Sequence, residues 1–459
     1  MRWNSRMAEK LLSVAVLVIF VLNATGRLYK LKRRTRARYN YYFGKDGPPT
    51  YAKLRKWEAA LPQHNLSLPF PEGKYGRYVR FSNQVRWLGW NNVFNDVLMS
   101  AHLAYISDRA YVFQDYYWAQ EHYHWPPSTY VSYEARTPLP AIISGPVAGG
   151  AFEPGDTAPR SISDDWWEVV CPLASRRLIN ARQVKKQIPD DASGLAVLEH
   201  WQQILHDATE SCVEVISANW EGEGDGLPQV FDLWVWSSPR VLSLWDTFST
   251  SPISRLLGPS PIVQDAVERN SVLFAPRGSR PPSAAVVKDA YRRMLAIHLR
   301  RGDYESHCRN LAGYRSGFYG WAQFHHLPDR FDTETVEEKV FRRCFPDVEL
   351  VVKKVAEARK DYLVGHEGGT LDVVYVLTNG EKEWVEALGE ALRADGWARV
   401  LSSVDLVLDK EQMDVAMAVD MELARKAEVF VGNGWSSFTS NIVYQRLLDN
   451  RDPITIRFT

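Results

Sequence analysis

The sequence lacks several patterns that would assign a function directly. It contains no Asp-x-Asp triplet, no Gly-x-x-x-x-Gly-Lys-Ser/Thr loop and no His-Glu-x-x-His pair. These absences argue against a diphosphate held by a carboxylate-bound metal, against P-loop chemistry and against zincin-type hydrolysis. An excess of either charge is also lacking, because 55 Lys and Arg residues balance 55 Asp and Glu residues. Composition therefore gives no indication of nucleic-acid binding.

Cysteine is scarce, with Cys171, Cys212, Cys308 and Cys344 as the four in the chain. No Cys-x-x-Cys pair and no Cys/His ligand spacing occurs among them, so a structural zinc site is not expected. Two disulfides could form in an oxidising compartment, and three connectivities are compatible with four cysteines. The pairing of Cys308 with Cys344 is one possibility, and the sequence alone does not choose.

Long apolar runs are lacking except near the N-terminus. Residues Leu11–Leu22 are apolar apart from Ser13 and have basic residues on both sides. This pattern predicts a signal anchor at 11–26 after a cytosolic tail at 1–10, although the run is short for a membrane span. A buried core helix is the alternative.

The region at 27–74 contains several prolines and no sustained periodicity, as expected of a stem or linker. Its first part is basic, which by the positive-inside rule favours a cytosolic location for the rest of the chain. A large domain can nevertheless translocate despite flanking charge, and Asn65 begins an Asn-x-Ser glycan acceptor motif. We therefore expect a single-pass type II membrane protein of the Golgi or endoplasmic reticulum lumen, with a cytosolic location as the alternative.

A chain of 459 residues is longer than one hydrophobic core usually supports, so two domains with a cleft between them are expected. The Pro- and Gly-rich run Pro276–Pro282 marks the boundary, which predicts domains at 75–283 and 284–459. Beyond this run, strands alternate with helices, which is typical of a parallel sheet covered on both faces. Ligands bind such sheets at the carboxyl ends of the strands.

The periodicity of apolar residues predicts individual elements. Strands are expected at Arg77–Phe81, Ala110–Phe113, Met294–Leu299, Val373–Leu377, Arg399–Leu401 and Val429–Val431. Helices are expected at Asn92–Arg109, Ser193–Leu205, Ser237–Leu257, Thr335–Tyr362 with a break at Pro346, and Met413–Lys426.

The first chemical motif is the hexapeptide from His298 to Asp303, at the end of a predicted strand. Alternation sends Arg300 and Arg301 to opposite faces, so one of them should face the cleft. A guanidinium can bind two phosphate oxygens and stays charged at working pH, which suits a diphosphate leaving group. Gly302 permits close backbone approach, and Asp303 can orient an arginine. A surface ion pair is the alternative.

The second motif runs from Val431 to Asn441, where a strand gives way to a helix. Its glycines permit a tight turn, and the hydroxyls of Ser436, Ser437 and Thr439 could bind phosphate oxygens together with the amides of the helix N-terminus. Simple helix capping is an equally weighted interpretation.

The third motif, Leu88-Gly89-Trp90-Asn91-Asn92, precedes a predicted helix and could present amides to a ligand across the cleft. An Asn N-cap is the alternative.

Together these motifs resemble the GDP-fucose protein O-fucosyltransferases and their fungal relatives. The resemblance spans roughly 75–446 but is specific only at the motifs, and nothing is recognised between about 118 and 283. It implies a GT-B fold, in which two Rossmann-like domains face each other across a cleft. It also implies inverting transfer of fucose from GDP-fucose to a hydroxyl of a protein or glycan, with no metal cofactor.

The resemblance also assigns roles to residues. The His-x-Arg signature falls on His298 and Arg300, so Arg300 would contact the donor β-phosphate and the glycosidic oxygen and stabilise the leaving diphosphate. His298 and Asp303 would help to bind the donor. Asp420 falls at the family's guanine-reading aspartate, since a carboxylate can accept from N1–H and the N2 amine.

The remaining motifs match the other side of the family's cleft and its phosphate site. Ser436, Ser437 and Phe438 would meet the donor's phosphates and nucleoside. The N-terminal Gly-x-x-Asn loop is matched by the segment Gly89 to Asn92. Asn91 would be the active-site asparagine, with Gly89 and Asn92 also binding substrate.

One departure concerns the general base. Some members carry a glutamate before the glycine of the N-terminal loop, and Leu88 stands at that position here. The proton could instead leave through the substrate or a water, or pass to Asp115, Glu121 or His124. These lie in or beside an aromatic segment that extends to residue 133 and could form an acceptor groove. The missing acid also supports a second hypothesis, a catalytically inactive nucleotide-sugar or glycan-binding protein with a retained GT-B cleft.

Overall fold

The computed structural model describes residues 47–83, 88–131, 135–217, 229–275, 290–330, 337–366 and 369–459. The predicted cytosolic tail, signal anchor and first part of the stem lie outside these ranges. Within them, no helix combines the length and the apolar character needed to cross a membrane. The domain boundary expected at 283–284 also falls outside, within 276–289.

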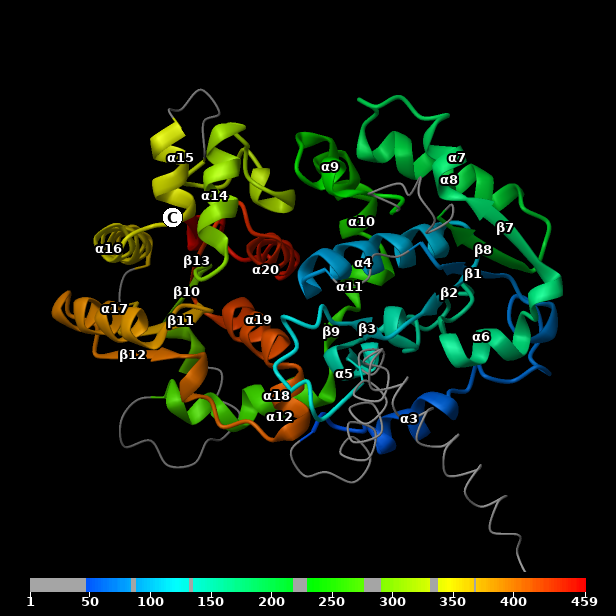
Figure 1. The fold of residues 1–459 in the computed structure, drawn as a ribbon, viewed down its shortest axis with the longest axis horizontal. Coiled ribbons are helices and arrows are strands. Elements are labelled where there is room, and N and C mark those ends of the chain that lie inside the picture. Colours follow the sequence, from blue (N-terminus) through cyan, green and yellow to red (C-terminus); the bar gives the residue numbers. More distant parts are fainter. Residues whose placement is uncertain are drawn as a thin grey trace, which may run out of the picture.

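Two five-stranded parallel sheets form the two halves of the molecule (Figure 1). In the first, the strand order is β6 (Ile162–Ser163), β2 (Ala110–Phe113), β1 (Tyr78–Phe81), β8 (Cys212–Ile216) and β7 (Arg176–Asn180). In the second, it is β12 (Arg399–Ser402), β11 (Val373–Thr378), β10 (Met294–Leu299), β13 (Val429–Gly432) and β14 (Ile456–Phe458). The expected α/β class with parallel sheets is confirmed.

The second sheet is buried on both faces, which explains its continuous apolar strands. Along β10, Leu295 and Ile297 pack against α16 (Val348–Gly365) and α17 (Lys382–Ala394) on the outer face. Their neighbours Met294 and Ala296 join the core that continues into the first domain. Because β10 and β11 pair in register from Met294 to Leu299, both strands end at the same edge of the sheet.

The two domains meet along helices near the middle of the molecule (Figure 1). In the first domain, α4 (Trp90–Ile106) contacts α20 (Ser437–Leu448) of the second. Close by, α12 (Pro261–Asn270) packs on α19 (Ala416–Lys426). One cluster of buried side chains runs through this contact, so the domains share a core at their interface.

Two expectations about local structure differ from the fold. The helix expected at Ser237–Leu257 is divided into a 3-10 helix at Pro239–Leu244, α10 (Trp245–Ser249) and α11 (Pro252–Arg255). A proline cannot continue a helix because it has no N–H and its ring clashes with the preceding turn, and two of these pieces start at a proline. The residues from 47 to 74, expected in a stem, contain α3 (Ala52–Ala59) and a buried Tyr51.

All four cysteines are paired. Cys308 bonds with Cys344, one of the pairings compatible with the sequence, and Cys171 bonds with Cys212. The Cys308–Cys344 disulfide joins α14 (Tyr304–Gly313), the helix after the loop that follows β10, to α15 (Glu337–Cys344). The Cys171–Cys212 disulfide lies in the first domain and links the end of α6 (Asp164–Val170) to β8.

Candidate functional site

A cavity of about 930 Å³ lies between the two domains, at the carboxyl ends of β10, β11 and β13. Its other walls come from the start of α4, the aromatic segment at 116–124 and α9 (Leu233–Trp236). Open α/β sheets bind ligands at this edge. The ten residues to which the family resemblance gave a role in the site all line the cavity: Gly89, Asn91, Asn92, His298, Arg300, Asp303, Asp420, Ser436, Ser437 and Phe438.

The loop after β10 separates the two arginines. Asn379, in the turn after β11, accepts a hydrogen bond from the Arg301 amide at 2.8 Å and donates to the Arg301 carbonyl oxygen at 3.2 Å. The Arg301 guanidinium lies 3.8 Å from the Phe345 ring centre and 4.3 Å from the Trp384 ring centre, outside the cavity. Such stacking is stabilising. Arg301 is therefore a structural residue, and Arg300 is the arginine that reaches the cavity.

Arg300 is accessible to a ligand. Its Nη2 lies 3.2 Å from Asp303 Oδ2, and the two side chains are 34% and 59% exposed. The surface ion pair, which was the alternative interpretation of this motif, is thus present, but pairs this exposed contribute little to stability. A phosphate could therefore bind the guanidinium without a large loss of free energy from the ion pair. The guanidinium also lies 5.8 Å from the Tyr304 ring centre, which limits its freedom.

His298 is buried beside the cavity. Its Nδ1 lies 3.0 Å from Thr439 Oγ1, and its ring centre is 4.7 Å from that of Phe438. Burial, followed by the positive charge of Arg300, lowers the pKa of His298 to about 3. The imidazole is therefore neutral at neutral pH. It can form a hydrogen bond with a ligand but adds no positive charge to the site.

The glycines of the second motif leave room for close packing behind the cavity. A Cβ atom at Gly432 would lie 2.3 Å from Thr439 Cγ2, and one at Gly434 would lie 2.5 Å from Phe318 Cδ1. Neither position can hold a larger residue without displacing its neighbour. The end of β13 (Val429–Gly432) therefore packs closely against the first turn of α20.

The N-terminus of α20 opens into the cavity. The Ser436 hydroxyl accepts a hydrogen bond from the Phe438 amide at 3.2 Å, so the predicted cap is present. Other amides of a first helical turn have no acceptor inside the helix, and the positive end of the helix favours an anion. Capping by Ser436 and binding of a phosphate near Ser437 are therefore compatible with each other.

Asp420, on α19, lies on the cavity wall between two donors. Its Oδ1 accepts from the Tyr375 hydroxyl at 2.5 Å, and its Oδ2 accepts from the Ser403 hydroxyl at 2.7 Å. Burial raises the pKa of the Asp420 carboxyl to about 6, and the two hydrogen bonds oppose that rise. A carboxylate at this position can accept further hydrogen bonds from a ligand.

The start of α4 faces the second domain. Gly89 is the N-cap residue and no side chain caps this helix, so the alternative of an Asn N-cap is wrong. Asn91 instead meets Asn441, whose Nδ2 donates to Asn91 Oδ1 at 3.2 Å. Asn92 Oδ1 accepts from the Tyr319 hydroxyl at 3.3 Å. These amides connect the first domain to the wall that carries Arg300.

The three residues considered as general base lie in different surroundings. Asp115 does not line the cavity, and it forms ion pairs with Arg55 at 2.5 Å and Arg136 at 3.5 Å. It is therefore not placed to accept a proton there. Glu121 and His124 both line the cavity.

A buried carboxylate that the sequence did not reveal joins the domains beside this aromatic segment. Asp414, at the end of α18 (Lys410–Asp414), accepts hydrogen bonds from Tyr51 at 2.8 Å, Trp125 at 2.7 Å and Thr137 at 2.7 Å. Trp125 and Thr137 belong to the first domain, and Tyr51 lies in the segment that precedes it in the chain. Asp414 thus fixes the aromatic segment against the second domain.

Aromatic side chains form much of the remaining wall, as expected for the segment after residue 116. At one end, α9 and the region after α14 add two exposed rings that sequence reasoning missed, Trp234 at 70% exposure and Tyr314 at 84%. No motif identifies these rings.

Asn379 also lines the cavity and was not predicted as a site residue. The sequence could have indicated it, because it lies in a Thr-Asn-Gly turn at the carboxyl end of a predicted strand.

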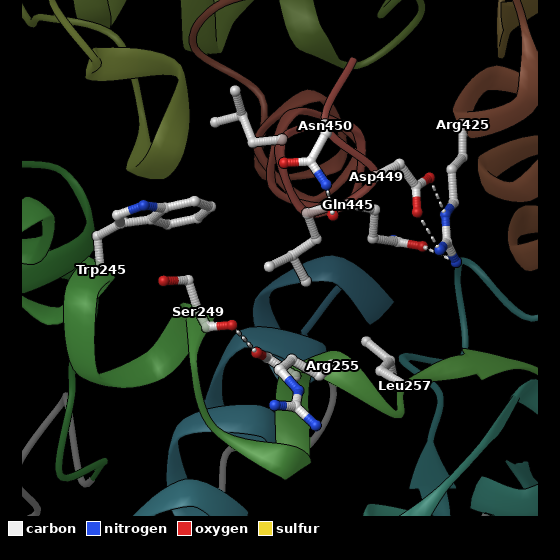
Figure 2. Close-up of a pocket in the computed structure, with 11 residues that line it drawn as sticks. Trp245, Ser249, Arg255, Leu257, Arg425, Gln445, Asp449 and Asn450 are labelled. Atoms are coloured by element: carbon white, nitrogen blue, oxygen red, sulfur yellow. Dashed lines mark hydrogen bonds and ion pairs between the residues drawn. The ribbon is translucent and has the colours of Figure 1, made fainter.

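A second cavity of about 430 Å³ lies at the opposite end of α20 (Figure 2). Its two arginines are already paired: Arg425 forms two hydrogen bonds of 2.7 Å with Asp449, and Arg255 pairs with Glu153. Among the described residues that line it, none offers a cation without a carboxylate partner. The cavity at Arg300 is therefore the better candidate for an anionic ligand.

No family model and no curated protein matches this chain. Among solved structures, POFUT1 in complex with GDP-fucose is similar at 14% identity, over 81% of this chain and 94% of that one, with a TM-score of 0.48. Fucosyltransferase NodZ from Bradyrhizobium is similar at 10% identity, over 81% of this chain and 93% of that one, with a TM-score of 0.40. Likenesses this distant do not assign the chain to a family or give it a substrate.

Proposed function

We propose that this chain is an inverting, metal-independent glycosyltransferase that transfers fucose from GDP-fucose to a hydroxyl of a protein or glycan. The observation that carries the proposal is that three distant motifs and Asp420 converge on one cavity between two parallel-sheet domains. Arg300 and the N-terminus of α20 can bind a diphosphate, and the Asp420 carboxylate can accept hydrogen bonds from a nucleobase that has two adjacent donors.

In this mechanism, the acceptor oxygen forms a bond to the anomeric carbon while the bond from that carbon to the β-phosphate oxygen breaks. Negative charge then develops on the leaving diphosphate, and the Arg300 guanidinium stabilises it. Attack from the face opposite the diphosphate inverts the anomeric configuration. Of the three side chains considered as general base from the sequence, Glu121 and His124 line the cavity and are placed to take the acceptor's proton.

We also propose a type II membrane protein, anchored by residues 11–26, in the lumen of the Golgi or endoplasmic reticulum. Two disulfides support an oxidising compartment. Asn65 is exposed, as an acceptor of an N-linked glycan must be. A glycosidase-sensitive mass shift that disappears in Asn65→Gln tests this topology, and an unshifted wild-type chain would contradict it.

Replacing Arg300 tests the proposed activity. Arg300→Ala should lower kcat by about 100-fold to 1,000-fold, because a preorganised charge that acts on the leaving group is lost. The measurement is transfer and hydrolysis of GDP-fucose, together with a melting curve. Arg342→Ala is the matched control, since Arg342 is an exposed arginine of the same domain outside the cavity. Undiminished turnover in a folded Arg300→Ala protein would overturn the proposal.

The second hypothesis, an inactive nucleotide-sugar or glycan-binding protein, is favoured by one observation. Leu88 occupies the position where a glutamate base would stand, and it offers only its backbone carbonyl oxygen, which accepts from Tyr116 at 2.9 Å. Calorimetry with GDP and GDP-fucose separates the two functions. Binding without hydrolysis or transfer would support the binding protein.

A further inference from the structure

We propose that Tyr375 and Ser403 are positioning residues that hold the Asp420 carboxylate so that it selects guanine as the base of the bound nucleotide. This inference rests on the proposed function, because it concerns the nucleotide end of the same cavity.

The two hydroxyls reach Asp420 from neighbouring strands. Tyr375 lies in β11, is fully buried and packs in the core that faces the first domain. Ser403 immediately follows β12, whose residue Leu401 pairs with Tyr375. Asp420 comes from a separate element, α19. Both carboxylate oxygens therefore accept a hydrogen bond, one from a residue in β11 and one from the residue after β12. The carboxylate cannot rotate without losing one of them.

This attachment decides which hydrogen bonds remain for a ligand. Each carboxylate oxygen has two lone pairs, and one at each oxygen is occupied by Tyr375 or Ser403. Two acceptor sites therefore remain side by side at the cavity. Guanine presents two parallel donors at its N1–H and N2 amine, which match this pair. Uracil has one donor between two carbonyl oxygens, and adenine has an acceptor beside its amine, so both would meet repulsion.

The arrangement requires an ionised Asp420. Burial raises the pKa of its carboxyl to about 6, while hydrogen bonds from Tyr375 and Ser403 favour the charged form. Burial together with the charges of Asp420 and Asp405 raises the pKa of Tyr375 well above its ordinary value, so Tyr375 remains a donor. When Asp420 is protonated, one acceptor oxygen becomes an O–H donor, which would face an N–H donor of guanine and could not form a hydrogen bond with it. Guanine binding should therefore weaken as pH falls through about 6.

The first test is the pH dependence of GDP binding by the full-length protein, measured by calorimetry between pH 5 and 8. Tyr375→Phe and Ser403→Ala each remove a hydrogen bond to a charged group, which should weaken GDP binding about tenfold at pH 7. Each should also raise by about one unit the midpoint pH at which GDP affinity falls. A purely structural role would weaken binding without moving the midpoint. Ser403→Ala keeps the test available if Tyr375→Phe does not fold.

Tyr362→Phe is the matched control. Its hydroxyl also donates to a carboxylate of the second domain, Glu428 at 3.2 Å, but this pair does not line the cavity. GDP affinity and midpoint should both be unchanged in this variant.

The second test exchanges the base preference. Asn at position 420 would present one acceptor and one donor, which match the N1–H and the C2 carbonyl of xanthine. Asp420→Asn should therefore bind xanthosine diphosphate at least tenfold more tightly than GDP, with no midpoint near pH 6. The wild-type protein should show the opposite preference and should bind ADP and UDP weakly.

The outcomes separate this inference from the proposed function. If wild-type protein does not bind GDP, the proposed function fails. If it binds GDP but both Tyr375→Phe and Ser403→Ala keep the wild-type affinity and midpoint, the positioning role is overturned while the function stands. If Asp420→Asn still prefers GDP to xanthosine diphosphate, the selection of guanine by Asp420 is overturned.

Discussion

The side chain of Asn441 donates hydrogen bonds to two oxygens of Asn91, the backbone carbonyl oxygen at 3.1 Å and Oδ1 at 3.2 Å. Asn441 is fully buried on α20, and Asn91 belongs to the first turn of α4. One amide group therefore fixes the N-terminal motif of the first domain relative to the helix that starts at the proposed phosphate site.

Asn441→Ala should disturb turnover more than donor binding. Loss of the amide frees Asn91 but leaves Arg300 and Ser436 in place, so we expect kcat to fall about tenfold with little change in GDP affinity. Stability should fall by about 1–3 kcal/mol, because buried oxygens lose their donor. Steady-state kinetics and GDP calorimetry measure the two effects. A variant that loses GDP affinity but keeps kcat would show that the contact serves the donor site instead.

The neutral state of His298 makes stability depend on pH. Its pKa is about 3 in the folded protein, compared with about 6.5 for an unperturbed histidine. Between about pH 3 and pH 6.5 His298 is therefore protonated in the unfolded chain and neutral in the folded chain. Its contribution to the free energy of unfolding is full above about pH 6.5 and is lost as pH falls toward 3. In His298→Asn, the melting temperature should decrease less steeply as pH falls from 7 to 4 than it does in the wild-type protein. An unchanged slope would show that His298 is protonated in the folded protein.

Arg446 is expected to be essential for the stability of the second domain. It is fully buried on α20, and its guanidinium donates to backbone carbonyl oxygens that include those of Ala427 at 2.5 Å and Glu428 at 2.9 Å. Arg446→Ala leaves these oxygens unpaired and should lower the free energy of unfolding by about 3–5 kcal/mol in denaturant titrations. The half-exposed Arg451 is the control, since its ion pair with Glu428 should contribute less than about 1 kcal/mol. Similar losses in both variants would refute this distinction.

Asp414 should control the contact between the domains at the aromatic wall. Asp414→Ala would leave the donors of Tyr51, Trp125 and Thr137 unpaired in the interior, at a cost of about 3 kcal/mol or more. We expect a lower melting temperature and faster proteolysis near the aromatic segment. Asp409→Ala, at the exposed cap of α18, is the comparison and should have a smaller effect. Equal proteolysis rates for wild type and Asp414→Ala would contradict the proposed link.

Local patterns predicted the second domain better than the first. The strands β10, β11 and β13 are continuous apolar runs followed by turn residues, so their positions follow from burial on both faces. In the first domain, β6 has two residues and β7 is a half-exposed edge strand, and neither shows a period. Their pairing depends on long-range contacts, which a single sequence does not display.

The sequence by itself determined the chemical groups of the site and their place at strand ends, because periodicity fixes where a strand stops and which residues follow it. Alternation also required that Arg300 and Arg301 point to opposite sides. Alternation did not say which of the two faces the cavity; the family resemblance assigned that place to Arg300, and the tertiary structure shows Arg300 in the cavity lining and Arg301 outside it. Phe345 and Trp384 stack on Arg301, and both come from segments distant in the chain. The same holds for Asp414 and Tyr375, whose partners are chosen by packing between elements and not by any local pattern.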